Sequence, residues 1–331
     1  MNILTHAQLY GWLDSLAKER LLIAPKYVAG LLLYRPVERS AEIAWGSTRP
    51  VMSIKEAFFP PTERLLTIEK VGQQVSLTET LPEGNPVIFG VRPCDAHGMQ
   101  VLDAMFIDNS PLDPYYARRR ENATLIGLAC QEMGPSCFCT SVGGAPDDTT
   151  GMDIMLTEAS DRFVAQVITE KGQALLQGLS LAEFHGEMPR PRLNEPFAQV
   201  ERETWQTHFN DEYWERMAER CLSCRICAYV CPTCRCFSVR DEALPESGQF
   251  ERIRCWDSCA GENYRRIAGG HRPRAEKGER LRNRFLCKFY YYPEQYGLDK
   301  TVACTGCGRC VDACPVNVDI TEVLMELGRL P

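Results

Sequence analysis

Long apolar runs are missing from this chain of 331 residues. No stretch approaches the ~20 consecutive apolar residues that a membrane-spanning helix needs, so we expect no membrane span. Near the N-terminus, Lys18, Glu19 and Arg20 interrupt the apolar pattern and no small-residue cleavage site follows, which argues against a secretory signal. We therefore expect a reducing, cytoplasmic setting, in which cysteines are free, catalytic or metal-bound rather than joined in disulfides.

Nucleotide-binding signatures are also missing. The glycines at 141–144 and 268–270 have neither the spacing nor the strand–turn–helix context of a dinucleotide-binding motif, and there is no P-loop. We therefore expect that the chain does not bind NAD(P) itself.

An overall excess of positive charge is missing too, because the net charge is −7. Nucleic acid is therefore not an expected partner. Basic residues concentrate in one segment, 265–288, which has nine Lys or Arg and two Glu. The segment fits a docking face for an acidic partner or a positive field that tunes a metal potential. It also fits a solvated helix with pairs such as Glu276–Arg280, which we favour.

The first 195 residues predict one mixed α/β domain within an α+β chain that is long enough for about two domains. Leu9, Trp12, Leu13 and Leu16 have helical spacing, with Thr5 as the N-cap. A hairpin is expected at 152–169 and a helix at 170–179, before a Pro-rich linker at 186–196. Short apolar segments typical of strands lie at 27–37, 64–71, 73–81, 86–94 and 123–130.

In contrast, the chain is rich in cysteine and contains 17 of these residues. Residues 221–232 and 304–315 both read C-x2-C-x2-C-x3-C-P, the run that binds a [4Fe-4S] cluster. In paired runs, the first three cysteines surround one cluster and the fourth reaches the other. We therefore assign Cys221, Cys224, Cys227 and Cys314 to one cluster, and Cys304, Cys307, Cys310 and Cys231 to the second. The distance between the runs predicts a ferredoxin-like, α-helical domain at 196–331 with an insertion at about 237–303.

Two other interpretations of these runs are weaker. Two complete runs that end in Cys-Pro are not typical of zinc sites. Cys227, Cys231 and Cys234 also have the spacing of radical-SAM sites, but that chemistry requires three cysteines of its own. Cys227 and Cys231 are already assigned to two different clusters.

Four cysteines of the N-terminal half predict a third [4Fe-4S] cluster. Cys94 and Cys130 each follow an expected strand, and the carboxyl ends of strands in open sheets are where residues meet at a shared site. Cys137 and Cys139, flanked by Ser and Thr, lie on a Gly/Pro-rich loop that can fold back toward them. The alternative is a set of buried free thiols.

The insertion holds a further set of candidate metal ligands, which fits no standard spacing. A cluster, a zinc site and packing thiols all remain open for it. The candidate ligands of this set are Cys234, Cys236, Cys255 and Cys259. Cys287 belongs to no set, and we expect it to be structural.

Taken together, these segments resemble a known family. It is the iron–sulfur electron-transfer family shared by anaerobic sulfite reductase and by cytoplasmic sulfhydrogenases, the NAD(P)-linked nickel–iron hydrogenases, in which it forms the beta subunit. The resemblance rests on "GVRPCDAHGMQVLDAMF", "CFC", "CPTCRCF", "RCWDSC", "AGGHRPR" and the two ferredoxin runs. It implies electron transfer from or to a flavin- and NAD(P)-binding partner, with a hydrogenase or a siroheme sulfite reductase as the catalytic component. The paired C-x2-C motifs of a nickel–iron centre are missing, so we do not expect this chain to activate hydrogen.

Three functions follow from these observations. We expect an electron relay that has no catalytic residue of its own. The alternative is a reductase component whose N-terminal cluster binds and reduces a small substrate, with Asp95 and His97 supplying protons. A regulator that binds nucleic acid through 265–288 is disfavoured by the acidic remainder of the chain.

Overall fold

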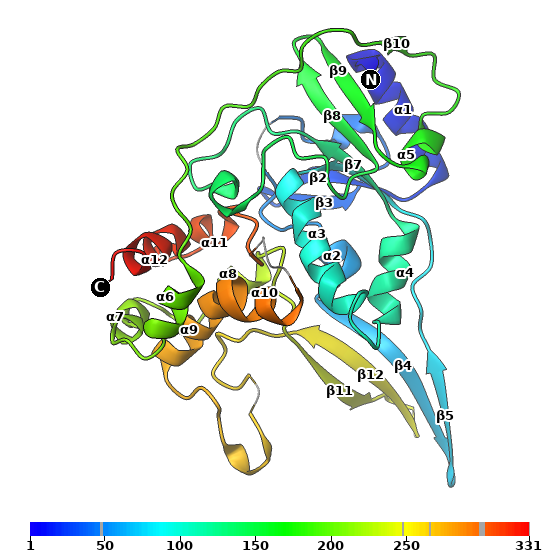
Figure 1. Ribbon diagram of the computed structural model, residues 1–331. Helices are drawn as coiled ribbons and strands as arrows, with labels where there is room; N and C mark the ends of the chain where they lie inside the picture. The colour runs from blue at the N-terminus through cyan, green and yellow to red at the C-terminus, as the bar shows by residue number, and fades with distance from the viewer. Residues whose placement is uncertain (47–48, 247, 265, 298–301, 331) are drawn as a thin grey trace.

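The computed structural model describes residues 1–46, 49–246, 248–264, 266–297 and 302–330. A mixed sheet with helices on both faces lies above a long, narrow second sheet, and a group of helices lies beside them (Figure 1). The expected mixed α/β architecture is therefore confirmed. The boundary expected near residue 195 remains a prediction. Among the described helices, none is both long enough and apolar enough to cross a bilayer.

The first sheet has the strand order β10-β1-β9-β8-β7-β6-β2-β3. Its centre, from β2 through β6 and β7 to β8, is parallel, and both margins are antiparallel. The strands are β1 (Asn2–Thr5), β2 (Leu22–Val28), β3 (Leu31–Pro36), β6 (Val87–Val91), β7 (Thr124–Leu128), β8 (Ile154–Ala159), β9 (Arg162–Val167) and β10 (Ala182–Glu183).

Two hydrophobic cores cover the faces of this sheet. Because alternate side chains of a strand point to opposite faces, Val87 and Phe89 of β6 join one core and Ile88 joins the other. A register shift between Phe89 and Val91 places Val91 in the same core as Ile88. The first core includes α1 (His6–Glu19) and α5 (Glu170–Leu175), and the second includes α2 (Lys55–Phe58), α3 (Pro93–Phe106) and α4 (Pro114–Asn122).

The first helix confirms its prediction. Thr5 accepts from the Gln8 backbone N–H at 3.2 Å, and Gln8 Oε1 accepts from the Thr5 N–H at 2.9 Å. This capping box satisfies two backbone donors that a helix start otherwise leaves unpaired. The four buried residues of α1 are the predicted Leu9, Trp12, Leu13 and Leu16.

The second sheet joins distant parts of the chain in the order β11-β12-β4-β5, with every neighbour antiparallel. Its strands are β4 (Thr62–Val71), β5 (Gln74–Glu79), β11 (Phe237–Ala243) and β12 (Gln249–Trp256). Arg254 of β12 is buried and forms ion pairs with Glu63 and Asp113. The expected insertion therefore contributes two strands to a sheet that begins at residue 62.

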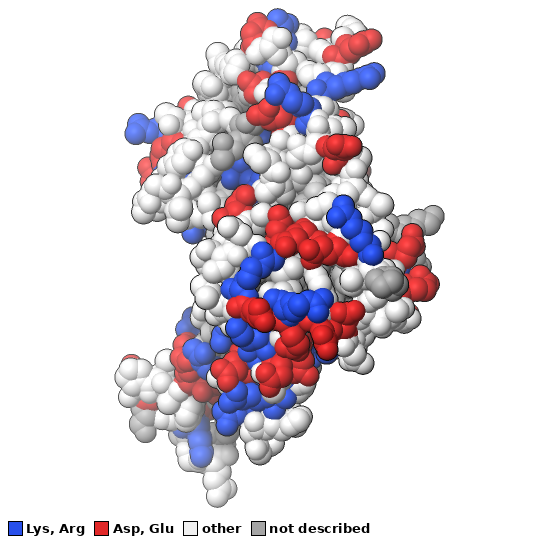
Figure 2. All heavy atoms as spheres, turned by 90° about the vertical axis from the view of Figure 1, so that its left-hand side faces the viewer, with Lys and Arg blue, Asp and Glu red and all other residues white. Residues whose placement is uncertain are grey.

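Most of the remaining helices pack around Trp205, Trp214, Phe285 and Val323. On the face that Figure 2 shows, acidic and basic side chains are interleaved rather than gathered by sign. The helices are α6 (Arg202–Thr207), α7 (Tyr213–Glu219), α8 (Ile226–Tyr229), α9 (Lys277–Leu286), the π-helix η4 (Cys287–Tyr291), α10 (Tyr292–Gln295), α11 (Arg309–Asp312) and α12 (Ile320–Leu327). Short 3-10 turns are η1 (Ser40–Glu42), η2 (Cys139–Val142) and η3 (Ala268–Gly270).

Candidate metal centres

The two ferredoxin runs fold into matching loops. In each loop, the residues two and four positions after the first cysteine have positive φ, and a one-turn helix, α8 or α11, follows. Alternating left-handed residues of this kind turn successive backbone N–H groups toward one side, which suits an anionic group. The residues are Ser223 (φ 53°) and Arg225 (68°) in the first loop, and Gly306 (61°) and Gly308 (72°) in the second.

Cys231 belongs to the first run in the sequence, but its thiol lies beside the thiols of the second run. Burial, with a smaller contribution from the neighbouring Cys231 thiolate, raises the pKa of Cys304 to about 12 and that of Cys310 to about 11. Cys227 also lies near Cys310, so the thiols of the two runs are adjacent. Cys231 thus lies beside Cys304 and Cys310, with which the motif groups it, and the two ligand sets remain a prediction.

The thiols of Cys221, Cys224 and Cys314 lie nearer the surface. Cys224 is exposed. The backbone N–H of Ser223 donates to Cys221 Sγ at 3.4 Å, and that of Val318 donates to Cys314 Sγ at 3.2 Å. N–H donors of this kind stabilise thiolates and tune the potential of a bound cluster.

The four N-terminal cysteines come together at one edge of the first sheet. β6 and β7 are parallel neighbours, so Cys94 and Cys130, which follow them, lie at the same edge. Cys130 is near Cys94 and Cys137, and Cys139 is near Cys130 and Cys137. Burial raises the pKa of Cys139 to about 12. A cavity of about 510 Å³ is lined by all four cysteines and by Cys307 of the second run.

The second run contacts the N-terminal loop backbone to backbone. The Phe138 N–H donates to the Gly306 carbonyl at 2.8 Å, and Cys137 Sγ lies 3.7 Å from the Cys307 carbonyl oxygen. A Cβ at Gly306 would lie 2.5 Å from Cys139 Cα. Only glycine permits both this approach and the positive φ, so the two sets of thiols are held side by side.

Comparison with known proteins places this geometry in a family. Residues 220–318 match the 4Fe-4S dicluster domain. The chain is 32% identical over 307 residues to sulfhydrogenase 2 subunit beta of Pyrococcus furiosus, covering 89% of this chain and 88% of that protein. The chain belongs to the sulfhydrogenase beta-subunit family. No solved structure matches it.

The donor set of this family member fits iron–sulfur clusters. All 17 cysteines lie among the described residues, and all are free of disulfides. Within the same part of the chain, no three Cys, His, Asp or Glu side chains converge closely enough to hold a single metal ion. The 4Fe-4S dicluster domain that residues 220–318 match favours clusters over zinc in the two runs.

The basic segment 265–288 differs from the solvated helix that we expected. Instead of pairing with Glu276, Arg280 is buried and donates to the Arg274 and Ala275 carbonyls. Arg284, four residues on, is also buried. The cause is the i, i+4, i+8 spacing of Arg280, Arg284 and Lys288, which places three cations on one buried helical face. Two of them, Arg284 and Lys288, lie near the thiols of Cys231 and Cys234. That spacing is the sequence signal that could have revealed it.

Lys288 makes the closest of these contacts. Its Nζ lies 3.1 Å from Cys231 Sγ and 3.6 Å from Cys234 Sγ. Burial alone would lower the pKa of Lys288, but the thiolates of Cys231 and Cys234 raise it well above its ordinary value. A buried cation therefore faces the second set of ferredoxin thiols.

Asp95 is held away from a role as proton donor. It is fully buried and accepts from Arg309 Nη2 at 2.8 Å and from the Tyr34 hydroxyl at 3.2 Å. Burial alone would lower the pKa of Arg309, but Asp95 and the thiolate of Cys307 raise it well above its ordinary value. The ion pair therefore ties α3 to α11 of the dicluster segment. His97, the other expected donor, has its pKa lowered by burial.

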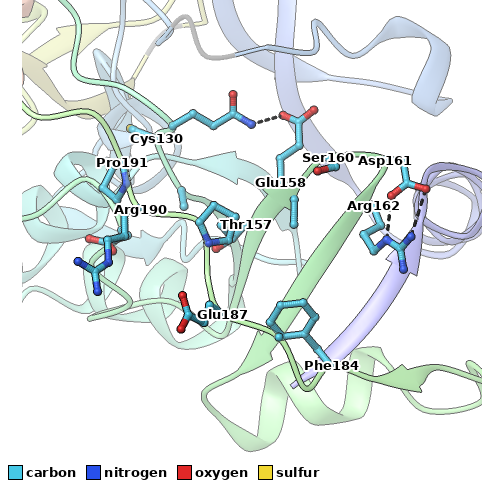
Figure 3. A pocket seen from close by; sticks show the side chains of 16 residues that line it. Cys130, Thr157, Glu158, Ser160, Asp161, Arg162, Phe184, Glu187, Arg190 and Pro191 are labelled. Atoms are coloured by element: carbon cyan, nitrogen blue, oxygen red, sulfur yellow. Dashed lines mark hydrogen bonds and ion pairs between the residues drawn. The ribbon is translucent and has the colours of Figure 1, made fainter.

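A second hollow adjoins the N-terminal thiols (Figure 3). Its volume is about 600 Å³, and its lining includes Glu158, Arg190 and Phe184. Cys130 lines both this hollow and the thiol-lined cavity. The N-terminal site therefore reaches close to the molecular surface at Cys130.

The insertion cysteines group differently from our expectation. Cys255 lies within β12, opposite Ser238 of β11 and Thr62 of β4. The other three expected ligands, Cys234, Cys236 and Cys259, lie near one another, and Cys287, which we expected to be structural, joins them. A hydrogen bond from Cys259 lowers the pKa of Cys236 to about 5. Nothing in the spacing distinguishes Cys255 from Cys287, because the grouping depends on the pairing of β11 with β12.

Proposed function

We propose that this chain is the electron-relay component of a hydrogenase complex, with three [4Fe-4S] clusters in a row. The clusters supply one-electron carriers, and the protein holds them, spaces them and excludes water around them. The ligands of the first two are Cys221, Cys224, Cys227 and Cys314, and Cys304, Cys307, Cys310 and Cys231. The ligands of the third are Cys94, Cys130, Cys137 and Cys139.

The observation that carries this proposal is the direct contact between the N-terminal loop and the second run. Gly306 touches Cys139, and Cys307 lines the same cavity as the N-terminal thiols. On its other side, Cys310 of the second run lies near Cys227 of the first. The second set of thiols therefore lies between the other two, which is the arrangement that a relay needs.

Positive charge around the N-terminal thiols supports the third cluster. Arg49 Nη1 donates to Cys137 Sγ at 3.1 Å, and Arg49 also pairs with Asp312 of α11. Arg309 Nη1 lies 4.0 Å from Cys94 Sγ. Four half-buried thiolates require such compensation, because an isolated charge removed from water is costly.

The partners that we propose are a nickel–iron catalytic protein and a flavin- and NAD(P)-binding protein, in the cytoplasm. The relative's name, that of a sulfhydrogenase component, favours a hydrogenase over a siroheme sulfite reductase. Anaerobic purification of the native complex through this chain, followed by metal and cofactor analysis, distinguishes them. Nickel with flavin supports the hydrogenase, whereas siroheme with flavin replaces it with sulfite reduction.

Substitution of single cysteines tests the relay itself. Cys224→Ala and Cys307→Ala each remove one proposed ligand and should abolish electron transfer through the complex, while each partner retains its own half-reaction with an artificial electron carrier. Cys255→Ala, outside the proposed ligand sets, is the matched control and should retain transfer. Physiological turnover that survives both ligand substitutions would refute the relay.

The thiol-lined cavity supports a second candidate function, reduction of a small substrate at the N-terminal site. Its volume of about 510 Å³ leaves space for a ligand beside the four thiols. Carbon monoxide is a suitable probe, because it binds an iron that has a free coordination position. A change in the electron paramagnetic resonance spectrum under carbon monoxide would favour catalysis, and an unchanged spectrum favours the relay.

A further inference from the structure

We propose that Cys234, Cys236, Cys259 and Cys287 bind an additional iron–sulfur cluster. This site is separate from the three of the relay and does not depend on which partners the complex contains. It replaces Cys255 of the sequence-based set with Cys287.

Three separate segments bring these thiols together. Cys234 and Cys236 lie between the first ferredoxin run and β11, Cys259 follows β12, and Cys287 begins η4. The Asp257 N–H donates to the Cys236 carbonyl at 2.9 Å, and this hydrogen bond joins the segment of Cys236 to that of Cys259. The thiol of Cys259 is hydrogen-bonded to that of Cys236 and lies near those of Cys234 and Cys287, so Cys259 is the centre of the group.

The thiols face a cavity that can hold more than an ion. Cys236, Cys259 and Cys287 all line a hollow of about 860 Å³, which is closed partly by Tyr264 and Tyr291. The single-ion spacing that zinc requires is not found among the described residues, and the same is true of the dicluster cysteines. The hollow therefore leaves room for a cluster beside these three thiols.

Cations face this group as they face the ferredoxin thiols. Arg235 Nη2 donates to Cys287 Sγ at 3.4 Å, and its guanidinium lies 3.5 Å from the centre of the Tyr292 ring, which fixes it in place. Lys288 Nζ lies 3.6 Å from Cys234 Sγ. Two cations directed at four thiols are expected where the thiols bind as thiolates, and they are unnecessary for packing thiols.

The backbone at Cys287 adds an independent indication. Residues 287–291 form a π-helix, a conformation that is rare in proteins and is frequent at functional sites. The extra residue per turn shifts the direction of the side chains between α9 and α10. Cys287 and Lys288 stand at the start of this shift, where one contacts the insertion group and the other contacts Cys231.

The site adjoins the relay through Cys231 and Cys234. These two thiols are hydrogen-bonded to each other, and Cys231 is a proposed ligand of the second cluster. An additional cluster here would therefore lie beside the middle cluster of the row.

Iron and sulfide analysis of the full-length chain, prepared anaerobically, tests the proposal. Cys236→Ala and Cys287→Ala should each lose about two to four iron and an equal amount of sulfide per chain, depending on whether the cluster is [2Fe-2S] or [4Fe-4S]. Cys255→Ala is the matched control and should keep the full content. The dicluster signals in electron paramagnetic resonance should persist in all three variants, which shows that they fold.

Each contrary outcome overturns the proposal. Equal iron in the wild type, Cys287→Ala and Cys255→Ala means packing thiols, and stoichiometric zinc means a different metal. A Cys236–Cys259 disulfide found by mass spectrometry in the anaerobic chain means a redox-active pair. These readouts do not involve electron transfer, so the site can fail while the relay holds, and the relay can fail while the site holds.

Discussion

Replacement of Lys288 by methionine should lower the reduction potential of the cluster that Cys231 helps to bind. Methionine keeps the unbranched shape of the side chain and removes its charge. Reduction adds a negative charge to the site, and Lys288 Nζ stabilises it from 3.1 Å away from Cys231 Sγ. Loss of the cation therefore disfavours the reduced form more than the oxidised form.

The size of this effect follows from the distance. At an effective dielectric constant of about 20, unit charges 3.1 Å apart interact by about 5 kcal/mol. Added charge spreads over a cluster and its four thiolates, so we take roughly a quarter to a half of that value, about 1–3 kcal/mol. For a one-electron couple this corresponds to a decrease of roughly 40–130 mV.

An anaerobic redox titration of the full-length chain, monitored by electron paramagnetic resonance, measures the decrease. Lys18→Met, an exposed change of the same charge on α1, is the matched control and should leave every potential within about 10 mV because distant surface charges are screened. An unchanged or raised potential in Lys288→Met, with full iron content, would refute the electrostatic argument.

Three other predictions concern packing and folding. Gly306→Ala should lose iron at the N-terminal site and lower the free energy of unfolding by more than the roughly 1–2 kcal/mol of backbone strain alone. The control Gly297→Ala, at φ +65° with no described neighbour within 4 Å, should show only the strain. Iron analysis and thermal unfolding measure both effects. Arg254→Leu should cost about 3 kcal/mol in urea unfolding, because it leaves the buried Glu63 with one arginine partner fewer, while the exposed Arg252→Leu should cost less than about 1 kcal/mol. Removal of iron by anaerobic chelation should raise amide hydrogen exchange across α9 and η4, whose buried cations lose their counter-charges, and should leave the first sheet protected.

Local patterns predicted much of the first sheet and the thiols at its edge. Helical spacing and an N-cap sufficed for α1, and strand-like segments that end at Cys94 and Cys130 predicted that these two cysteines would meet. Both inferences depend on a few neighbouring residues and on the geometry of parallel strands. The crossed position of Cys231 followed from a motif whose spacing already encodes the fold.

Long-range pairing set the limit of prediction. The periodicity of 237–256 does not reveal that these residues continue a sheet begun at residue 62, and that pairing is what separates Cys255 from the other insertion thiols. The high charge content of 265–288 alone also suggests a solvent-exposed segment, whereas the cations at 280, 284 and 288 face inward. A charged residue is normally solvated, and burial becomes favourable here because thiolates face Arg284 and Lys288 and backbone carbonyls accept from Arg280.

The topology of the second sheet also sets an order of assembly during synthesis. Gln249 of β12 pairs with Glu69 of β4 across 180 residues of sequence, so a nascent chain carries β4 and β5 as an open hairpin until β12 emerges from the ribosome. An unpaired strand edge invites aggregation. Closure of the sheet draws the first ferredoxin run, which lies just before β11, into position before the second run has been made. Cluster insertion at the paired runs is therefore a late event, and messenger RNAs truncated before β12 should yield an aggregating product while those truncated after it should not.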